Sequence, residues 1–458
     1  MPIASINPAT GSTLAEFDEH DDQEVEARIA SAHDAYRALK STDFAERAGW
    51  MRAAADLLDA DVEEVAELIT LEMGKTLAQA RAEVHKSAKA MRFYADNAEE
   101  FLSGSELADP SAVGASSART VYQPLGVVLA VMPWNYPIWQ VVRFAAPALM
   151  AGNTGLLKHA SNVPQAALYL DTLFERGGFP AGSFRSLLIP AAKVEKVIRD
   201  RRVVAVTLTG SEPAGRSVAS IAGSEVKHVV LELGGSDPFI VMPSADLDKA
   251  VATAVTSRTT NNGQACINAK RFIVHADVHD AFVEKFAAAM GALRVGDPLD
   301  EGTDIGPLAT KSGRTELAEL VDDALAGGAY AATGGRTPDG DGWFYPPTVL
   351  TGVTEHMRLY REEAFGPVAT VYRVADADEA LRIANDTTFG LSSAVWTQDA
   401  DEEAKIAGGL EAGAVFVNGM SISYPELPFG GVKDSGVGRE LSAEGIREFC
   451  NLKSIWKG

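Results

Sequence analysis

Residues 203–235 read VVAVTLTGSEPAGRSVASIAGSEVKHVVLELGG and contain one unit of the architecture. Val203–Leu208 is a short apolar run that predicts a buried strand, Glu212–Ala222 has the pattern of a helix, and His228–Leu233 predicts the next strand. Short apolar strands that alternate with helices predict a parallel sheet covered by helices on both faces. We therefore expect an α/β fold that binds its ligands at the carboxyl ends of the strands.

The same rhythm extends in both directions along the chain. Upstream, we predict strands at 127–131, 155–158 and 184–189 and helices at 139–150, 164–176 and 192–200. Downstream, a second α/β unit is predicted, with strands at 238–242, 271–275, 368–373, 392–397 and 414–418 and helices at 247–258 and 279–293. Residues 22–102 read as helical, 103–117 as a Ser-, Gly- and Ala-rich connection or arm, and 451–458 as a short β-like end.

Composition limits the class of protein. The chain has 458 residues, which indicates two or three domains. Its 41 Lys and Arg against 63 Asp and Glu give a net charge of −22, which argues against nucleic acid or an anionic membrane as a partner. The chain has two cysteines and no signal-peptide pattern, and none of its apolar runs approaches the ~20 residues that a membrane-spanning helix needs. These features favour a cytoplasmic protein. The eight histidines show no metal-ligand spacing, so we expect no metal site.

Two residues are candidates for covalent and acid–base chemistry. Cys266 follows a polar, Gly-containing loop that would expose its sulfur as a nucleophile. The alternative is that it is a small buried hydrophobe, which is the stronger interpretation for Cys450. Glu232 ends an apolar strand before two glycines, where an apolar setting would raise its pKa and make it a general base. A surface carboxylate at a strand end is the alternative.

Two loops that follow predicted strands are candidates for binding. Asn135, between two prolines, can offer an amide donor to an oxyanion, or can simply bond its own turn. The segment Thr209–Gly215 ends a strand and opens a helix, where backbone N–H groups suit a pyrophosphate. Its spacing is not GxGxxG, so an ordinary helix start capped by Ser211 remains open.

Taken together, these segments resemble the aldehyde dehydrogenase superfamily over essentially the whole chain. The motifs that carry the resemblance, in order, are Pro133–Asn135, Leu157–Lys158, Gly178–Pro180, Thr209–Ser211, Glu232–Gly235, Gly263–Cys266, Glu362–Pro367, Pro428–Lys433, Ser435–Gly436 and Gly438–Glu440. The resemblance implies three parts. They are a Rossmann-like cofactor domain (1–103 and 123–235), an α/β catalytic domain (236–435), and a β oligomerisation arm (104–122 and 436–458) that forms homodimers or homotetramers.

The resemblance also implies a role for each matched residue. Cys266 is then the nucleophile that forms a thioester, Glu232 the base that activates water, and Asn135 with the Cys266 backbone N–H the oxyanion hole. The cofactor is then NAD(P)⁺. The residues assigned to it are Lys158, Ser161, Trp134, Gly210, Ser211, Gly215, Glu363 and Phe365.

The choice of cofactor depends on the segment after Lys158. The usual NAD⁺-preferring pattern of the family has Glu three residues after the lysine, whereas this chain has Ser161. A Glu there would repel a 2′-phosphate, while Ser161 adds a donor and Lys158 supplies positive charge. We therefore expect a preference for NADP⁺, with NAD⁺ also possible.

The substrate expectation comes from the resemblance to short bacterial succinate-semialdehyde dehydrogenases. Arg143 matches an arginine that binds the distal carboxylate in those enzymes, and Ser423 lies in a loop that would contact it. Arg143 can equally be an arginine whose stem packs along a helix. Many such enzymes have a second arginine six residues before the nucleophile and a cysteine two residues after it; here these positions are Thr260 and Asn268.

Three other functions remain open at this stage. The first is a dehydrogenase for glutarate semialdehyde or an aliphatic aldehyde. The second is a non-catalytic protein that retains the fold, and the third is a thiol esterase, which would not explain Lys158 and Glu363.

Overall fold

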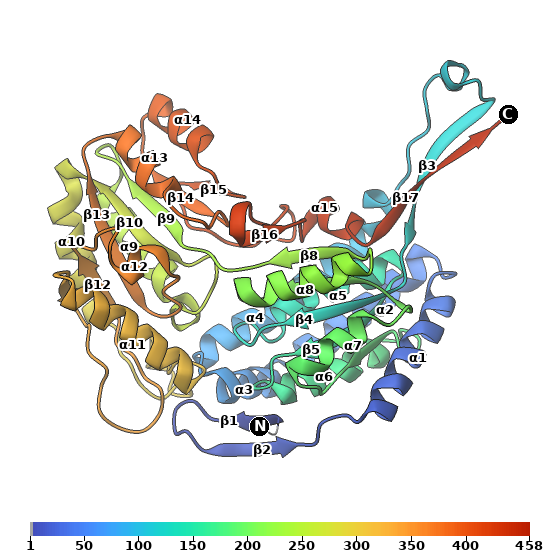
Figure 1. The fold of residues 1–458 in the computed structure, drawn as a ribbon, viewed down its shortest axis with the longest axis horizontal. Coiled ribbons are helices and arrows are strands. Elements are labelled where there is room, and N and C mark those ends of the chain that lie inside the picture. The colour runs from blue at the N-terminus through green and yellow to red at the C-terminus, as the bar shows by residue number, and fades with distance from the viewer. Residues whose placement is uncertain (1–2) are drawn as a thin grey trace.

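A computed structural model describes residues 3–458 and contains two large sheets joined by the chain (Figure 1). The first sheet has six strands in the order β16-β8-β7-β4-β5-β6, parallel except for β16. Its strands are β4 (Val127–Met132), β5 (Thr154–His159), β6 (Phe184–Ser186), β7 (Val203–Thr209), β8 (His228–Glu232) and β16 (Gly436–Val437).

Helices cover both faces of the first sheet because alternate residues of its buried strands point to opposite sides. Val128 and Ala130 pack toward α2 (Phe44–Ala60), α3 (Val62–Met73), α4 (Leu77–Phe101), α5 (Trp139–Ala151) and α6 (Pro164–Arg176). Val127 and Leu129 pack toward α1 (Asp22–Leu39), α7 (Val194–Ile198) and α8 (Glu212–Ser224). The predicted sheet with two covered faces is therefore present.

The second sheet has seven strands in the order β11-β12-β13-β10-β9-β14-β15, with only β11 antiparallel to its neighbour within the described chain. Its strands are β9 (Asp237–Val241), β10 (Ala269–His275), β11 (Tyr330–Thr333), β12 (Thr348–Thr351), β13 (Val368–Val374), β14 (Ser393–Trp396) and β15 (Val415–Val417). One face packs on α9 (Leu247–Thr259) and α10 (Ala276–Gly291). The other packs on α11 (Lys311–Ala326), α12 (Arg358–Arg361), α13 (Ala377–Asn385) and α14 (Ala400–Gly409).

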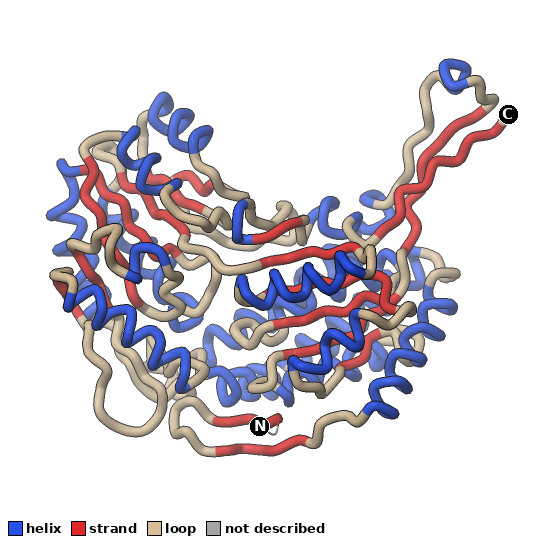
Figure 2. Tube along the Cα trace, in the orientation of Figure 1, coloured by secondary structure: helices blue, strands red, loops and turns tan. Residues whose placement is uncertain are grey.

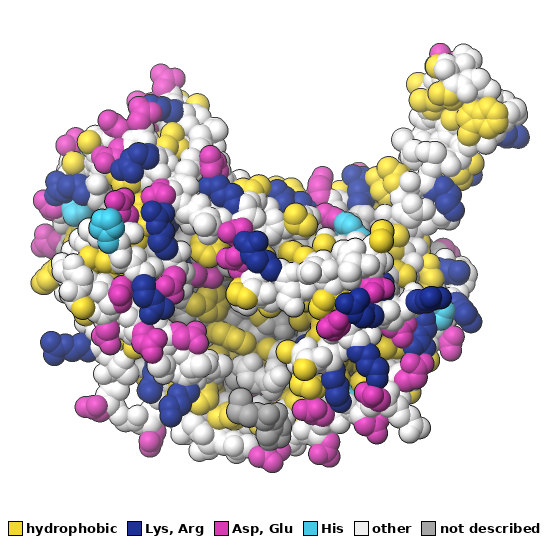
Figure 3. Space-filling model, in the orientation of Figure 1, with side chains coloured by type: hydrophobic (Ala, Val, Ile, Leu, Met, Phe, Trp, Pro, Cys, Tyr) yellow, Lys and Arg dark blue, Asp and Glu magenta, His cyan; other side chains and the backbone are white. Residues whose placement is uncertain are grey.

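A two-stranded antiparallel ribbon projects from the body, as the tube in Figure 2 shows clearly. It pairs β3 (Ser117–Pro124) with β17 (Cys450–Lys457), which follows α15 (Ser442–Arg447). Leu452, Ile455 and Trp456 on the ribbon are exposed, and apolar side chains gather at its tip in Figure 3. A small hairpin of β1 (Ile3–Ile6) and β2 (Thr13–Phe17) lies near the first sheet.

The predicted α/β class with parallel sheets is confirmed, with local differences. The helical region near residue 60 is two helices, α2 and α3, because Asp61 leaves the helical conformation. Strand β6 ends at Ser186, three residues earlier than predicted. The domain boundaries remain a prediction, and Met1 and Pro2 of the first predicted domain lie outside the described residues. No helix in residues 3–458 is long and apolar enough to cross a membrane.

Candidate active site

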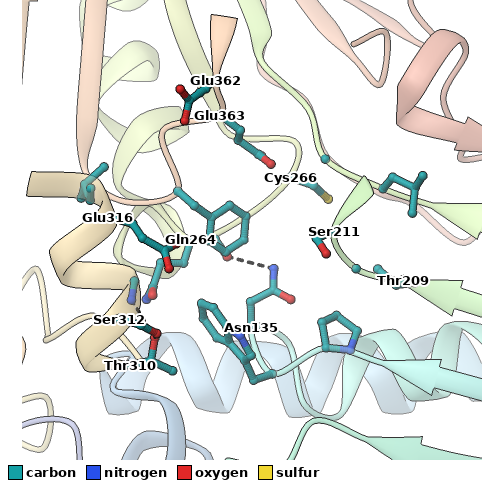
Figure 4. A pocket seen from close by; sticks show the side chains of 18 of the residues that line it. Asn135, Thr209, Ser211, Gln264, Cys266, Thr310, Ser312, Glu316, Glu362 and Glu363 are labelled. Atoms are coloured by element: carbon teal, nitrogen blue, oxygen red, sulfur yellow. Dashed lines mark hydrogen bonds between the residues drawn. The ribbon is translucent and has the colours of Figure 1, made fainter. Parts of the chain in front are cut away.

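The two sheets enclose a cavity of about 560 Å³ at the carboxyl ends of β7 and β8. Figure 4 shows Asn135, Ser211 and Cys266 around this space, although they come from three separate loops. Ligands of open α/β sheets bind at such strand ends, so the cavity lies where the fold predicts a site.

The loop before Cys266 has an unusual backbone that only certain residues allow. Asn261 and Asn262 have φ of 59° and 55°, and Gly263 has φ of 76°. Asparagine tolerates this left-handed region better than most residues, and glycine has no penalty there. A Cβ on Gly263 would also lie 2.4 Å from the carbonyl carbon of Gly366. The polar sequence before the cysteine therefore fixes a tight turn rather than a mobile loop.

Asn135 is held beside this turn with one donor unused. Its side chain is 4% exposed, and Nδ2 donates to the Gln264 carbonyl at 2.9 Å. Asn261 Nδ2 donates to the same carbonyl at 3.0 Å and to the Asn135 carbonyl at 2.8 Å. Because an amide group carries two donor hydrogens, Asn135 has one left to donate into the cavity.

The Cys266 thiol is protonated at neutral pH. Burial raises its pKa to about 12, against the opposing positive charges of Arg143 and Lys270. A Cβ on Gly235 would lie 2.8 Å from the Cys266 carbonyl oxygen, so the glycine lets the cysteine backbone approach the end of the first sheet. The sulfur therefore needs a base before it can act as a nucleophile.

Glu232 has the surroundings of a strong base. It ends β8 at 1% exposure, and neither carboxylate oxygen has a hydrogen-bond partner in the described chain. Burial, followed by the negative charge of Glu440, raises its pKa well above the usual range. The carboxylate lies against Gly430, whose added Cβ would be 2.8 Å from Oε1, and Glu232 does not itself line the cavity.

Five of the residues predicted to bind the cofactor line the cavity, namely Trp134, Gly210, Ser211, Glu363 and Phe365. Ser211 is the N-cap of α8, yet its hydroxyl makes no capping bond and stays available to a ligand. Trp134 and Phe365 pack edge to face with centroids 5.6 Å apart. Together they form an aromatic wall of the cavity.

The other three predicted cofactor residues lie outside the cavity. Lys158 is buried in β5, its ammonium has no ion-pair partner in residues 3–458, and burial lowers its pKa. Ser161 is exposed in the loop after β5, beside a small hollow lined by residues 187–189. Gly215 is buried in α8, where an added Cβ would lie 2.6 Å from Leu233 Cδ2, so it packs against β8's end rather than facing the cavity.

A model described as the aldehyde dehydrogenase family matches residues 1–455 of this sequence. The chain belongs to the aldehyde dehydrogenase family. A relative from Mycolicibacterium paratuberculosis, named succinate-semialdehyde dehydrogenase (NADP⁺), is 63% identical over 459 residues, which cover 100% of this chain and 97% of the relative. A second relative, named succinate-semialdehyde dehydrogenase (NADP⁺) 1, comes from Mycobacterium tuberculosis. It is 63% identical over 456 residues, which cover 100% of this chain and 100% of the relative.

A solved structure agrees with the fold of this aldehyde dehydrogenase. The succinic semialdehyde dehydrogenase of Streptococcus pyogenes, solved in complex with NADP⁺, superposes with a TM-score of 0.96. It is 37% identical and covers 99% of each chain. The family resemblance and the aldehyde dehydrogenase fold predicted from sequence are therefore confirmed.

The two residues predicted to bind substrate already have protein partners. Arg143 Nε forms an ion pair with Glu440, its Nη2 donates to Thr209 Oγ1 at 3.4 Å, and its guanidinium lies 4.7 Å from the Phe429 ring centroid. Ser423 is 4% exposed and lies beside α4 and α5 rather than in the cavity of Figure 4.

Sequence reasoning missed two charged residues that organise this aldehyde dehydrogenase site. Lys270 Nζ donates to the Cys266 carbonyl at 2.6 Å and lies 2.9 Å from Glu363 Oε1, so one buried ammonium orients both. A lysine within the apolar strand β10 was the signal. Glu440 stood in a quoted motif, but its partner Arg143 is distant in sequence and no local pattern indicated the pair.

Proposed function

We propose that this aldehyde dehydrogenase oxidises succinate semialdehyde to succinate, with NADP⁺ as the preferred oxidant and NAD⁺ as a weaker one. The observation that carries the proposal is the 63% identity, over the whole chain, to relatives named for that activity and cofactor. The cavity supports it, because a thiol and an amide donor face the same space.

The proposed chemistry takes place on Cys266. Its deprotonated sulfur adds to the aldehyde carbon, and the carbonyl oxygen becomes an alkoxide. The free Asn135 donor and the Cys266 backbone N–H stabilise that charge, and one such donor contributes roughly 2.7–4 kcal/mol. When bound, NADP⁺ supplies the hydride acceptor that turns this adduct into a thioester.

Glu232 completes the proposed cycle as a general base. Its raised pKa makes the carboxylate a stronger base toward water, and the resulting hydroxide attacks the thioester carbon. The C–S bond breaks, the acid leaves, and the Cys266 sulfur is released as the thiolate that begins the next cycle, while Glu232 passes its proton to solvent. A buried carboxylate without hydrogen-bond partners is suited to this task, since nothing in the described chain competes for its lone pairs.

The residues present fit the proposed cofactor. The N-terminus of α8 offers backbone N–H groups and the uncapped Ser211 hydroxyl to a pyrophosphate. Lys158 provides a buried cation without an acidic partner, and Ser161 beside it leaves room and a donor for a 2′-phosphate. Glu363, held by Lys270, would bond the nicotinamide ribose, and Trp134 and Phe365 would pack beside it.

We also propose a cytoplasmic homodimer or homotetramer. The ribbon of β3 and β17 extends away from the body and exposes Leu452, Ile455 and Trp456, which a second copy would cover. The proposed arm comprises residues 104–122 and 436–458, between cofactor (1–103, 123–235) and catalytic (236–435) domains. Light scattering on the purified protein tests the assembly, and a monomer at micromolar concentration would refute it.

The activity is tested by following NADPH formation with succinate semialdehyde and with butanal, a neutral aldehyde of the same length. We expect kcat/KM to favour the semialdehyde by about tenfold or more, which is about 1.4 kcal/mol of specificity. Replacing NADP⁺ by NAD⁺ should lower kcat/KM, and Cys266→Ser should abolish turnover. Equal rates with butanal would leave only a general aldehyde dehydrogenase.

A further inference from the structure

Helix α4 reaches the turn before the nucleophile through a single glutamine. Gln79, in the first turn of α4, accepts a hydrogen bond at its side-chain oxygen from the backbone N–H of Asn261. Asn261 is 1% exposed, so this N–H depends on an acceptor inside the protein. Asn261 Nδ2 in turn donates to the Asn135 carbonyl at 2.8 Å, so two hydrogen bonds in series connect Gln79 to Asn135.

The same face of α4 holds the other side of the Asn135 loop. Glu83 lies one turn after Gln79, and its Oε1 accepts from the backbone N–H of Ile138 at 2.8 Å and of Trp139 at 2.9 Å. These N–H groups lie at the start of α5, where the helix itself cannot satisfy them, so Glu83 fixes the place where α5 begins. Asn135 lies three residues before Ile138 and is therefore held from both directions by one face of α4.

A buried lysine completes the support of this loop. Lys75 and Glu83 form an ion pair in which both side chains are 0% exposed. Lys75 Nζ also lies 4.0 Å from the centroid of the Tyr136 ring, and Tyr136 follows Asn135 directly. Because a buried charge without its partner is costly, the ion pair keeps Glu83 in the position from which it reaches α5.

The link between α3 and α4 is also fixed against the turn that precedes the nucleophile. Gly74 ends α3 with φ of 83°, and its carbonyl accepts from Asn262 Nδ2 at 2.7 Å. A Cβ on Gly74 would lie 2.7 Å from the Pro307 carbonyl oxygen, so glycine permits this close approach. The start of α4 is therefore held in a fixed position relative to the turn that leads to Cys266.

We infer that Gln79 and Glu83 are positioning residues for the oxyanion site of the reaction. The inference rests on the proposed function, which makes Asn135 and the Cys266 backbone N–H the two oxyanion donors. Asn135 follows β4 of the first sheet and Cys266 precedes β10 of the second, so their separation needs a support that contacts both loops. Neither Gln79 nor Glu83 lines the cavity, and both act through the backbone that carries the donors.

The first test replaces Gln79 and measures the rate of the first turnover of NADPH formation with saturating succinate semialdehyde. Gln79→Met keeps the length of the side chain but has only a weak acceptor, and Gln79→Glu keeps an oxygen for the Asn261 N–H. We expect Gln79→Met to slow the first turnover about tenfold or more, with KM for NADP⁺ within about twofold of wild type. Gln79→Glu should be faster than Gln79→Met, and the control Glu99→Gln, an exposed position on the same helix, should behave as wild type.

Two double variants test Glu83 without leaving a buried charge unpaired. Lys75→Met with Glu83→Gln removes both charges but keeps an oxygen that can accept from the start of α5, whereas Lys75→Met with Glu83→Met removes the acceptor as well. We expect the first turnover to be about tenfold slower in the second than in the first, with urea unfolding to show that both proteins fold. Equal rates in the two folded proteins would overturn the role of Glu83.

A double-mutant cycle separates positioning from general structural damage. If Gln79 acts through Asn135, Gln79→Met should slow the first turnover by less than about twofold when Asn135 is already replaced by alanine. A full, additive loss in the Asn135→Ala background, or a normal rate in Gln79→Met alone, overturns the inference. A normal rate in Asn135→Ala alone overturns the oxyanion role in the proposed function instead.

Discussion

Replacing Asn135 with alanine should lower turnover strongly while leaving the fold nearly intact. The Gln264 carbonyl that Asn135 Nδ2 contacts keeps a second donor in Asn261 Nδ2 at 3.0 Å, so no buried acceptor is left alone. The Asn135 Oδ1 has no partner in the described chain, so its removal costs nothing. The stability loss should therefore be that of one net hydrogen bond, about 1 kcal/mol.

The effect on turnover should be larger. Loss of one oxyanion donor costs roughly 2.7–4 kcal/mol of transition-state stabilisation, or about 10²–10³ in kcat. NADPH formation at saturating aldehyde measures this, and urea unfolding measures stability. A kcat within tenfold of wild type in a folded Asn135→Ala protein would refute the oxyanion role.

Asn261→Ala provides the contrasting variant. Asn261 has φ of 59° and donates to both the Asn135 and Gln264 carbonyls, so alanine there strains the backbone and removes two hydrogen bonds. We expect both stability and activity to fall. If Asn135→Ala and Asn261→Ala lost stability equally, the separation between catalytic and structural asparagine would be wrong.

Three further outcomes are expected. Glu232→Gln should still form one equivalent of NADPH rapidly, but its steady-state rate should fall by about 10²–10⁴-fold, since the thioester is no longer hydrolysed. Loss of the rapid phase would mean that Glu232 also deprotonates the Cys266 thiol. In a Cys450→Ala background, the rate at which iodoacetamide modifies Cys266 should keep rising with pH up to about pH 10, because burial raises the thiol pKa to about 12. A rate that levels off near pH 8.5 would contradict this. Ser161→Glu should lower kcat/KM with NADP⁺ by about 100-fold through charge repulsion of the 2′-phosphate, with NAD⁺ little changed; unchanged NADP⁺ kinetics would remove Ser161 from the cofactor site.

Much of the fold could be predicted because its strands are buried on both faces. Apolar runs such as Val127–Met132 and Val203–Thr209 stand out between helices, and helix α6 was predicted to the residue. Elements near the surface were missed, among them α11, α13 and the β1–β2 hairpin. Helices α11 and α13 are amphipathic, and their buried apolar residues at helical spacing were overlooked among many charged ones. The β1–β2 hairpin consists of strands of only four and five residues, too short for a clear alternation.

The candidate site was predictable wherever a short motif carries its own geometry. Asn261, Asn262 and Gly263 are the residue types that a run of left-handed backbone requires, and they lie three to five residues before Cys266. The pairing of Arg143 with Glu440 was not predictable, because the two residues come from distant parts of the chain.

The electrostatics of the site depend on one residue whose effect only the fold reveals. Glu440 pairs with Arg143 and at the same time raises the pKa of Glu232. A single buried carboxylate thus reduces the positive charge available to a substrate and increases the basicity of the residue proposed to activate water. Arg143 still acts on the Cys266 sulfur, favouring its thiolate against the cost of burial. Because both effects come from Glu440, the charge of Arg143 and the basicity of Glu232 are coupled, and a change at Glu440 should alter both.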